Sequence, residues 1–116
     1  MKFREVTSYT DAALAETCIY VFYHPGIDKS RPFYIGKAKR FGGIPASRYN
    51  GGYKHLISGF LNLKFRLFVA DLGDAFSSAT HYEQTLIDAW NPICEQRRLK
   101  NFIKREIPAK PWEKHG

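Results

Sequence analysis

Cysteine is scarce in this 116-residue chain, which contains only Cys18 and Cys94, far apart in the sequence. No CxxC pair and no Cys/His spacing typical of a zinc site accompanies them. The pattern argues against a disulfide or a zinc site and favours two thiols that pack as small hydrophobic side chains.

Long apolar runs are also lacking. No stretch approaches the roughly 18 residues of a membrane-spanning helix. The N-terminal residues, MKFREVTSYTDAALAE, carry acidic side chains and have no apolar centre of the kind found in a signal peptide. We therefore expect a cytoplasmic protein with no membrane partner.

Acidic residues are few, because 11 Asp and Glu stand against 18 Lys and Arg and leave a net charge of +7. Such an excess of positive charge favours an anionic partner, with nucleic acid ahead of a membrane surface. The apolar fraction of 44% is sufficient for a packed core and argues against disorder. We expect one domain over residues 1–116, with a short N-terminal extension (1–16) and a loose tail (108–116).

The strand signals lie in three segments. Residues 17–23 (TCIYVFY) are β-branched and aromatic, and a second short apolar run follows at 33–36 (FYIG). The intervening HPGIDKSRP is rich in turn-forming residues, so the two runs predict a hairpin with a long loop. Residues 64–70 place Phe65, Leu67 and Val69 on one face of an extended chain and predict a third strand with one well-buried face.

Three helices are expected. The first begins near Tyr53, and the second covers about Thr80 to Trp90, where Pro92 ends it. The third covers roughly Cys94 to Glu106, with an apolar stripe surrounded by basic side chains. This order of elements predicts an α+β fold, in which helices flank a small three-stranded, mainly antiparallel sheet.

Two tyrosines in the predicted hairpin are the first candidates for chemistry. Period-two alternation places Tyr20 on one face of the first strand and Tyr34 with Gly36 on one face of the second, so the two phenols can stand side by side on one sheet surface. A tyrosine hydroxyl can orient a water molecule, or remove its proton if the tyrosine pKa is lowered. Gly36 would allow a phosphate or another backbone to approach closely, with Lys37 beside it as a point charge. Two tyrosines in a hairpin can equally be simple packing residues, so the pair alone does not identify a site.

Glu83 is the most informative acidic residue. It shares one helical stripe with Leu86, Ile87 and Trp90, which directs its carboxylate toward the sheet. Burial of a carboxylate is costly, and a divalent metal or hydrogen bonds would offset that cost. The alternative is a capping box, Thr80-x-x-Glu83, in which the carboxylate only satisfies the start of the helix.

The strings CIY at 18–20 and YIGKA at 34–38 resemble the paired strands that name the GIY-YIG nuclease superfamily. The order of parts over roughly residues 17–95 is also similar: two strands, a region with an Arg and a His, a third strand, and a helix carrying a Glu. Cys18 stands where the family name has Gly. The resemblance implies a metal-dependent DNA endonuclease that leaves 5′-phosphate and 3′-hydroxyl ends.

The resemblance also implies roles for individual residues. Tyr20 would act as the base or position the attacking water, with Tyr34 as its partner. Glu83 would be the protein ligand of one Mg²⁺ or Mn²⁺ ion per active site. Many family members carry an Asn after the proline that ends this helix, and here Gln96 or Asn91 would have to replace it.

The arginine and the histidine are less well defined. Arg48 is the candidate for the arginine that binds the phosphate, and Arg40 is its rival. His55 matches the active-site histidine loosely and can equally be a surface or packing residue. The residues expected to bind substrate are Gly36, Lys37, Lys39, Arg40, Arg97 and Arg98.

Double-stranded DNA is the expected partner. One active site per chain addresses one phosphodiester, so both strands would be cut either by a homodimer, which places two sites on the two strands, or by two successive nicks. Two other functions remain open: a catalytically inactive nucleic-acid-binding module, and an RNA-directed nuclease or toxin with the same fold.

Overall fold

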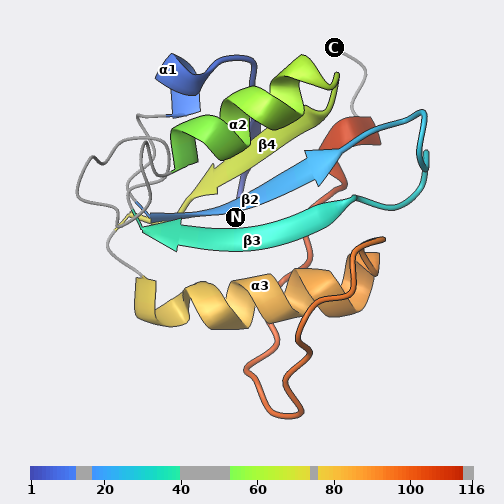
Figure 1. The fold of residues 1–116 in the computed structure, drawn as a ribbon. Helices are drawn as coiled ribbons and strands as arrows, with labels where there is room; N and C mark the ends of the chain where they lie inside the picture. The colour runs from blue at the N-terminus through green and yellow to red at the C-terminus, as the bar shows by residue number, and fades with distance from the viewer. Residues whose placement is uncertain (13–16, 40–52, 74–75, 114–116) are drawn as a thin grey trace.

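The computed structural model describes residues 1–12, 17–39, 53–73 and 76–113 (Figure 1). Its four strands form one antiparallel sheet in the order β1-β4-β2-β3. The strands are β1 (Phe3–Val6), β2 (Thr17–Tyr23), β3 (Tyr34–Lys39) and β4 (Arg66–Asp71). The helices are α1 (Tyr9–Ala12), α2 (Tyr53–Asn62), α3 (Phe76–Trp90) and the 3₁₀ helix η1 (Pro111–Glu113).

Helices cover the two faces of the sheet (Figure 1). On one face α2 packs its Ile57 against Cys18 and Phe22 of β2. On the other face α3 packs Leu86 and Ile87 against a second cluster, which contains Ile19, Val21 and Ile35. Every residue of β2 is buried, because this strand lies inside the sheet and is covered on both sides. The α+β class and the β2–β3 hairpin are therefore confirmed.

The predicted number of strands was wrong, because the sheet contains β1 as a fourth strand. Phe3 and Val6, the first and last residues of β1, belong to the clusters on opposite faces of the sheet. β1 pairs with β4, which lies more than sixty residues away in the sequence. Arg66 reinforces this pairing with two hydrogen bonds of 2.9 and 2.8 Å to the Glu5 carboxylate. Residues 3–6 of the expected N-terminal extension are thus part of the sheet. β4 also buries both its faces, whereas one buried face was expected.

The predicted final helix over Cys94–Glu106 was also wrong, since residues 91–110 form neither helix nor strand. Side chains of α3 hold this segment by its backbone instead. His81 Nδ1 accepts from the Ile103 N–H at 3.0 Å, and Thr85 Oγ1 accepts from the Arg105 N–H at 2.9 Å. Backbone groups that bond to α3 are not available for helical hydrogen bonds within the segment.

The expected loose tail carries a buried side chain. Trp112 in η1 is 6% exposed and stacks on Tyr23, with ring centroids 5.0 Å apart. It also meets Trp90 edge to face at 5.1 Å. Residues 108–113 therefore close one end of the α3-side cluster. Among the described residues, no helix has the length and apolar character needed to cross a membrane.

Replacement of Trp112 tests the corrected role of this segment. We expect Trp112→Ala to lower the free energy of unfolding by about 3–5 kcal/mol, because a large buried ring leaves a cavity. Denaturant unfolding measures the change, with Glu113→Ala at the exposed neighbouring position as the control. Equal stability of the two variants would show that the tail does not contribute to the core.

Candidate active site

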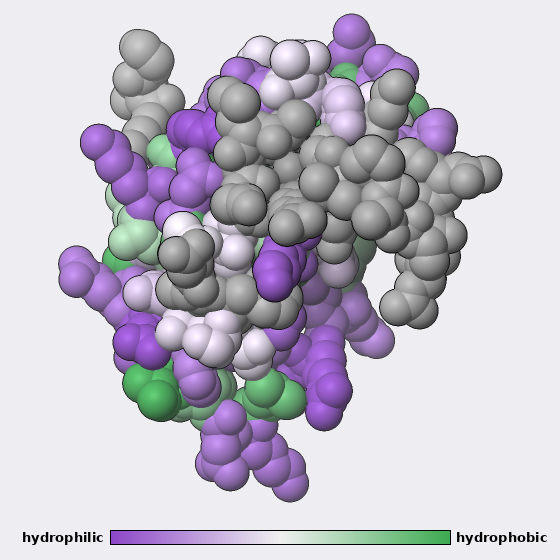
Figure 2. Space-filling model, turned by 90° about the vertical axis from the view of Figure 1, so that its left-hand side faces the viewer, coloured by the Kyte–Doolittle hydropathy of each residue, from purple (hydrophilic) through white to green (hydrophobic). Residues whose placement is uncertain are grey.

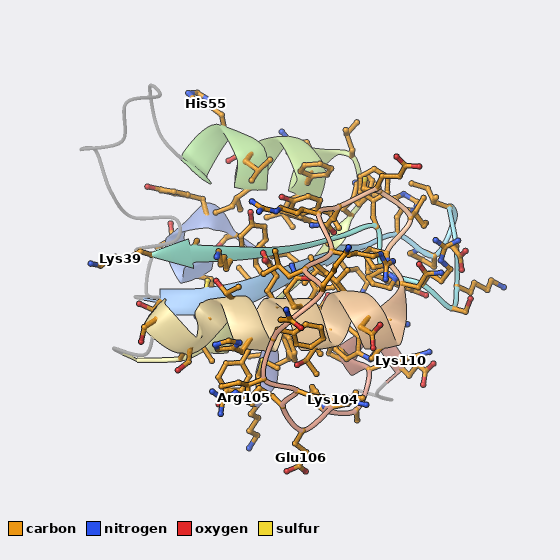
Figure 3. The ribbon with its side chains drawn as sticks, turned by 90° about the horizontal axis from the view of Figure 1, so that it is seen from below. Lys39, His55, Lys104, Arg105, Glu106 and Lys110 are labelled. Atoms are coloured by element: carbon orange, nitrogen blue, oxygen red, sulfur yellow. The ribbon has the colours of Figure 1, made fainter. Side chains whose placement is uncertain are left out.

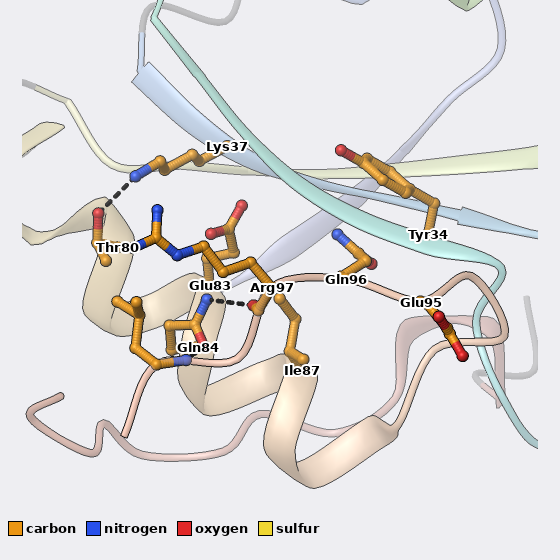
Figure 4. Close-up of a pocket in the computed structure, with 10 residues that line it drawn as sticks. Tyr34, Lys37, Thr80, Glu83, Gln84, Ile87, Glu95, Gln96 and Arg97 are labelled. Carbon is orange, nitrogen blue, oxygen red and sulfur yellow. Dashed lines mark hydrogen bonds between the residues drawn. The ribbon is translucent and has the colours of Figure 1, made fainter. Parts of the chain in front are cut away.

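A pocket of about 630 Å³ opens at the outer edge of β3, between this strand, α3 and residues 95–99 (Figure 4). It brings together side chains from parts of the chain that are distant in sequence. The described residues that line it are Tyr34, Lys37, Thr80, Glu83, Gln84, Ile87, Glu95, Gln96, Arg97 and Leu99.

Lys37 and Glu83 face each other across the interface between β3 and α3 (Figure 4). The Lys37 ammonium donates a hydrogen bond of 2.5 Å to Thr80 Oγ1, one helical turn before Glu83. Glu83 is half-buried, and burial raises the pKa of its carboxyl above the ordinary value. The positive charge of Lys37 acts in the opposite direction and lowers that pKa. The carboxylate predicted to face the sheet thus lies in the pocket.

The alternative role of Glu83 as part of a capping box is not supported by the geometry. Helix α3 begins at Phe76, a full turn earlier than the sequence suggested, so Thr80 lies within the helix and not at its N-cap. Its hydroxyl binds Lys37 instead.

The tyrosine pair lies on one surface of the hairpin, as predicted. Tyr20 is paired with Gly36, and Tyr34 lies diagonally from Tyr20 with ring centroids 6.1 Å apart. The two hydroxyl-bearing rings differ in exposure, because Tyr20 is 5% exposed in the α2-side cluster whereas Tyr34 is half-buried. Of the two, Tyr34 belongs to the described lining of the pocket.

Gly36 has a different role from the one expected. A Cβ atom at this position would overlap the ring carbons and the hydroxyl of Tyr20. The absence of a side chain therefore lets the Tyr20 ring cross over β3, and the space expected for a phosphate on this face is filled by that ring. The requirement for glycine is a requirement of packing.

Two glutamines build the remaining wall. The Gln96 amide accepts from the Ile35 N–H at 2.9 Å and donates to the Ile35 carbonyl, so it continues the hydrogen bonding of the sheet beyond β3. Gln84, 4% exposed, donates to the Arg97 carbonyl at 3.0 Å and accepts from the Leu99 N–H at 2.9 Å. Gln96 was a candidate from the sequence. Gln84 was missed, although a polar residue close to the apolar Leu86 and Ile87 of a helix signals a buried hydrogen-bonding role.

The basic residues that were predicted to bind substrate lie in different environments. Arg97 is exposed and lines the pocket. Arg98 instead donates to the Ile87 carbonyl at 3.3 Å and to Asn91 Oδ1 at 2.7 Å, so it satisfies the C-terminus of α3. Lys39 is exposed at the end of β3 and points away from the sheet in Figure 3.

Other predicted residues lie away from the pocket or outside the described chain. His55 is exposed on the first turn of α2, which covers the opposite face of the sheet from α3 (Figure 3). The structure does not bring it to the pocket. Arg40 and Arg48 both fall outside the described residues.

The pocket offers few ligands for a metal ion. Over the described ranges, no three His, Cys, Asp or Glu side chains form a metal-binding group. Glu83 and Glu95 are the acidic residues of the described lining, and Figure 4 shows Glu95 directed away from Glu83. One carboxylate fits Mg²⁺, which retains several waters and takes further oxygens from substrate phosphate. Neither cysteine belongs to the described lining, and burial raises the pKa of both thiols, that of Cys18 to about 12.

Comparison of the chain with known protein families, with curated proteins and with solved structures finds no match. The proposal below therefore depends on the motifs and on the geometry of the pocket.

Substitution at Gly36 tests whether Tyr20 needs this glycine. We expect Gly36→Ala to destabilise the fold by about 1–3 kcal/mol, because a methyl group meets the ring in a packed core. Gly59→Ala is the matched control, since a Cβ there meets nothing within 4 Å and alanine favours the helix by roughly 0.5–1 kcal/mol. The interpretation fails if Gly36→Ala is as stable as the wild type in denaturant unfolding.

The raised pKa of Glu83 predicts a pH-dependent stability. A folded-state pKa above the unfolded value contributes stability that is fully present below about pH 4.3 and is lost as the pH rises through the folded pKa. Glu83→Gln stays neutral and escapes this loss. In EDTA, the melting temperature of Glu83→Gln should therefore exceed that of the wild type by an amount that grows between acidic and neutral pH.

The exposed Glu95 supplies the control for this measurement, because Glu95→Gln removes a carboxylate from the same pocket wall. We expect Glu95→Gln to show no comparable pH trend. A Glu83→Gln difference that stays constant or shrinks with rising pH would contradict the burial of a charged Glu83.

Proposed function

We propose that this chain is a metal-dependent DNA endonuclease of the GIY-YIG type, which hydrolyses phosphodiester bonds to 5′-phosphate and 3′-hydroxyl ends. The observation that carries the proposal is the convergence of Tyr34, Lys37 and Glu83 in one open pocket. Two of these residues come from the YIGKA string, and the third comes from the helix in which the resemblance expects a glutamate. The net charge of +7 supports a polyanionic substrate.

Hydrolysis of a phosphodiester needs a positioned water, a proton acceptor and positive charge near the phosphoryl oxygens. In the proposed site the half-buried residue Tyr34 positions the water through its hydroxyl, or would accept the proton of the water in its phenolate form. Tyr20 acts behind it, since its buried ring packs against Tyr34 and fixes that ring's position. This assignment exchanges the two tyrosine roles that the resemblance implied, because Tyr34 is the one at the pocket.

Positive charge reaches the pocket from two sides. The Lys37 ammonium comes from β3 and the exposed Arg97 from the segment beyond α3 (Figure 4). Both can oppose the charge that develops on phosphoryl oxygens. Arg48, or Arg40, is proposed as a further phosphate ligand. His55 is proposed only as a contact of the α2 surface with DNA, because of its exposed position.

Glu83 is the proposed protein ligand of one Mg²⁺ or Mn²⁺ ion. Such an ion would supply Lewis-acid stabilisation of the phosphate and of the leaving oxygen. The half-buried carboxylate suits this role, because a bound cation offsets the cost of keeping it charged in a partly desolvated position. A cytoplasmic location and a homodimer that cuts both strands complete the proposal.

Plasmid cleavage tests the function and separates it from its alternatives. The wild type should nick or linearise supercoiled plasmid in Mg²⁺ and stop in EDTA. Glu83→Gln and Tyr34→Phe should each reduce the rate by roughly 10²-fold or more, as expected for groups that act in the transition state. Glu95→Gln is the matched control and should retain activity.

Each alternative gives a distinct result. DNA binding without cleavage in any divalent metal would identify an inactive binding module, and preferential digestion of RNA in a parallel reaction would identify an RNA-directed nuclease. Cleavage that persists in EDTA would overturn the metal-dependent mechanism.

A further inference from the structure

The segment Leu99–Ile107 forms a loop that projects below α3 (Figure 1). It exposes two aliphatic side chains, because Ile103 is 60% and Ile107 is 43% accessible. Among the described residues, only Ile27 and Leu63 are comparable exposed large hydrophobics, and neither belongs to this loop. Figure 2 shows hydrophobic atoms beside hydrophilic ones at this lower end of the molecule.

Positive charge is concentrated around the loop. Residues 94–110 contain six Lys and Arg and two Glu, a net charge of 6 − 2 = +4 out of the +7 of the chain. Lys100 and Lys104 are exposed, and within the described ranges neither forms an ion pair. Figure 3 shows Lys104 at the surface of the loop, seen from below.

The loop is held in shape by its backbone. The N–H groups of Leu99, Ile103 and Arg105 donate to Gln84, His81 and Thr85 of α3. The Arg105 guanidinium lies over the Tyr82 ring at 5.2 Å. A loop fixed in this way presents Ile103 and Ile107 outward with little further loss of conformational entropy on binding.

The loop also continues directly from the pocket. Arg97 and Leu99 line the proposed active site, and Lys100 follows in the sequence. Lys100 is therefore the next residue along the chain after Leu99 of the pocket lining, where a bound polyanion would extend from the pocket to the loop.

We propose that Leu99–Ile107 is a second DNA-binding element, which adjoins the catalytic pocket at Leu99. Lys100 and Lys104 bind backbone phosphates, and Ile103 and Ile107 pack into the minor groove of a duplex, where apolar side chains commonly wedge against base steps. The choice of duplex DNA as partner rests on the proposed function.

The composition of the loop favours a duplex over a lipid surface. Proteins that lie on membranes usually offer a wide apolar face with charges behind it. Here only Ile103 and Ile107 are exposed large aliphatic residues, and the exposed acidic Glu106 lies beside one of them. Two isolated aliphatic side chains among lysines match a groove lined by phosphates.

The test measures binding of the full chain to a labelled DNA duplex in EDTA, where the proposed enzyme does not cut. Ile103→Ser with Ile107→Ser should raise the dissociation constant about tenfold and leave its salt dependence unchanged. Lys100→Gln with Lys104→Gln should weaken binding and reduce the slope of log affinity against log salt by about two. Leu63→Ser and Lys29→Gln, at exposed positions elsewhere, are the matched controls and should bind as the wild type.

Binding of both loop variants within about twofold of the wild type would overturn the proposal. So would Ile-dependent binding to anionic phospholipid vesicles without binding to the duplex. The outcome is independent of the cleavage assay, because a chain that fails to cut in Mg²⁺ can still lose duplex affinity through the loop, and an active nuclease can bind without it. Melting temperatures equal to that of the wild type would show that the variants are folded.

Discussion

The wall of the pocket depends on hydrogen bonds between glutamine side chains and backbone. An edge strand and an irregular segment both carry backbone groups that must find partners when buried. The Gln96 side chain bonds to both the N–H and the carbonyl of Ile35 at the edge of β3. The Gln84 side chain bonds to the Arg97 carbonyl and the Leu99 N–H of the irregular segment. Each such bond contributes about 1 kcal/mol net, but loss of one partner leaves a buried group unsatisfied at about 1–3 kcal/mol. These hydrogen bonds hold the segment after α3 in place, and Arg97 lies in the part of the chain that they fix.

The sheet itself divides the candidate site. Alternation along β3 directs Tyr34 and Gly36 to the α2 face and Lys37 to the α3 face, where Glu83 lies. Residues on opposite faces of a sheet can meet only beyond its edge, and β3 is an edge strand. This explains why Tyr34 and Glu83 share a pocket while the more central Tyr20 does not belong to its described lining. The same arrangement explains the glycine at position 36, because the Tyr20 ring must cross β3 there to contact the Tyr34 ring.

The features predictable from the sequence were those that local pattern determines. Alternation and turn composition identified β2, β3 and β4, and the helical stripe with Pro92 identified the C-terminal part of α3. The strand β1 was missed because its stability comes from pairing with distant β4 and not from its own alternation. The stripe at 99–107 has a helical period, yet the α3 side chains His81, Gln84 and Thr85 bind its backbone and prevent a helix. For the candidate pocket, the sequence singled out Tyr34, Lys37 and Glu83, which line it, whereas the contacts of Gly36 and Thr80 depend on packing between elements.

The conformation of residues 97–104 also changes how positive charge is displayed. In a helix, which rises 1.5 Å per residue, Arg97 and Lys104 would lie about 10 Å apart along the axis. In the observed conformation the N–H groups of Leu99 and Arg105 bond to adjacent residues of α3, Gln84 and Thr85. The chain between them therefore leaves α3 and returns to it, so Lys100 and Lys104 lie in one exposed loop and not along a helix axis. Because α3 fixes the backbone of this loop, the arrangement of its lysines is set before any ligand binds. The same hydrogen bonds that prevent a helix therefore determine how the loop presents its positive charge.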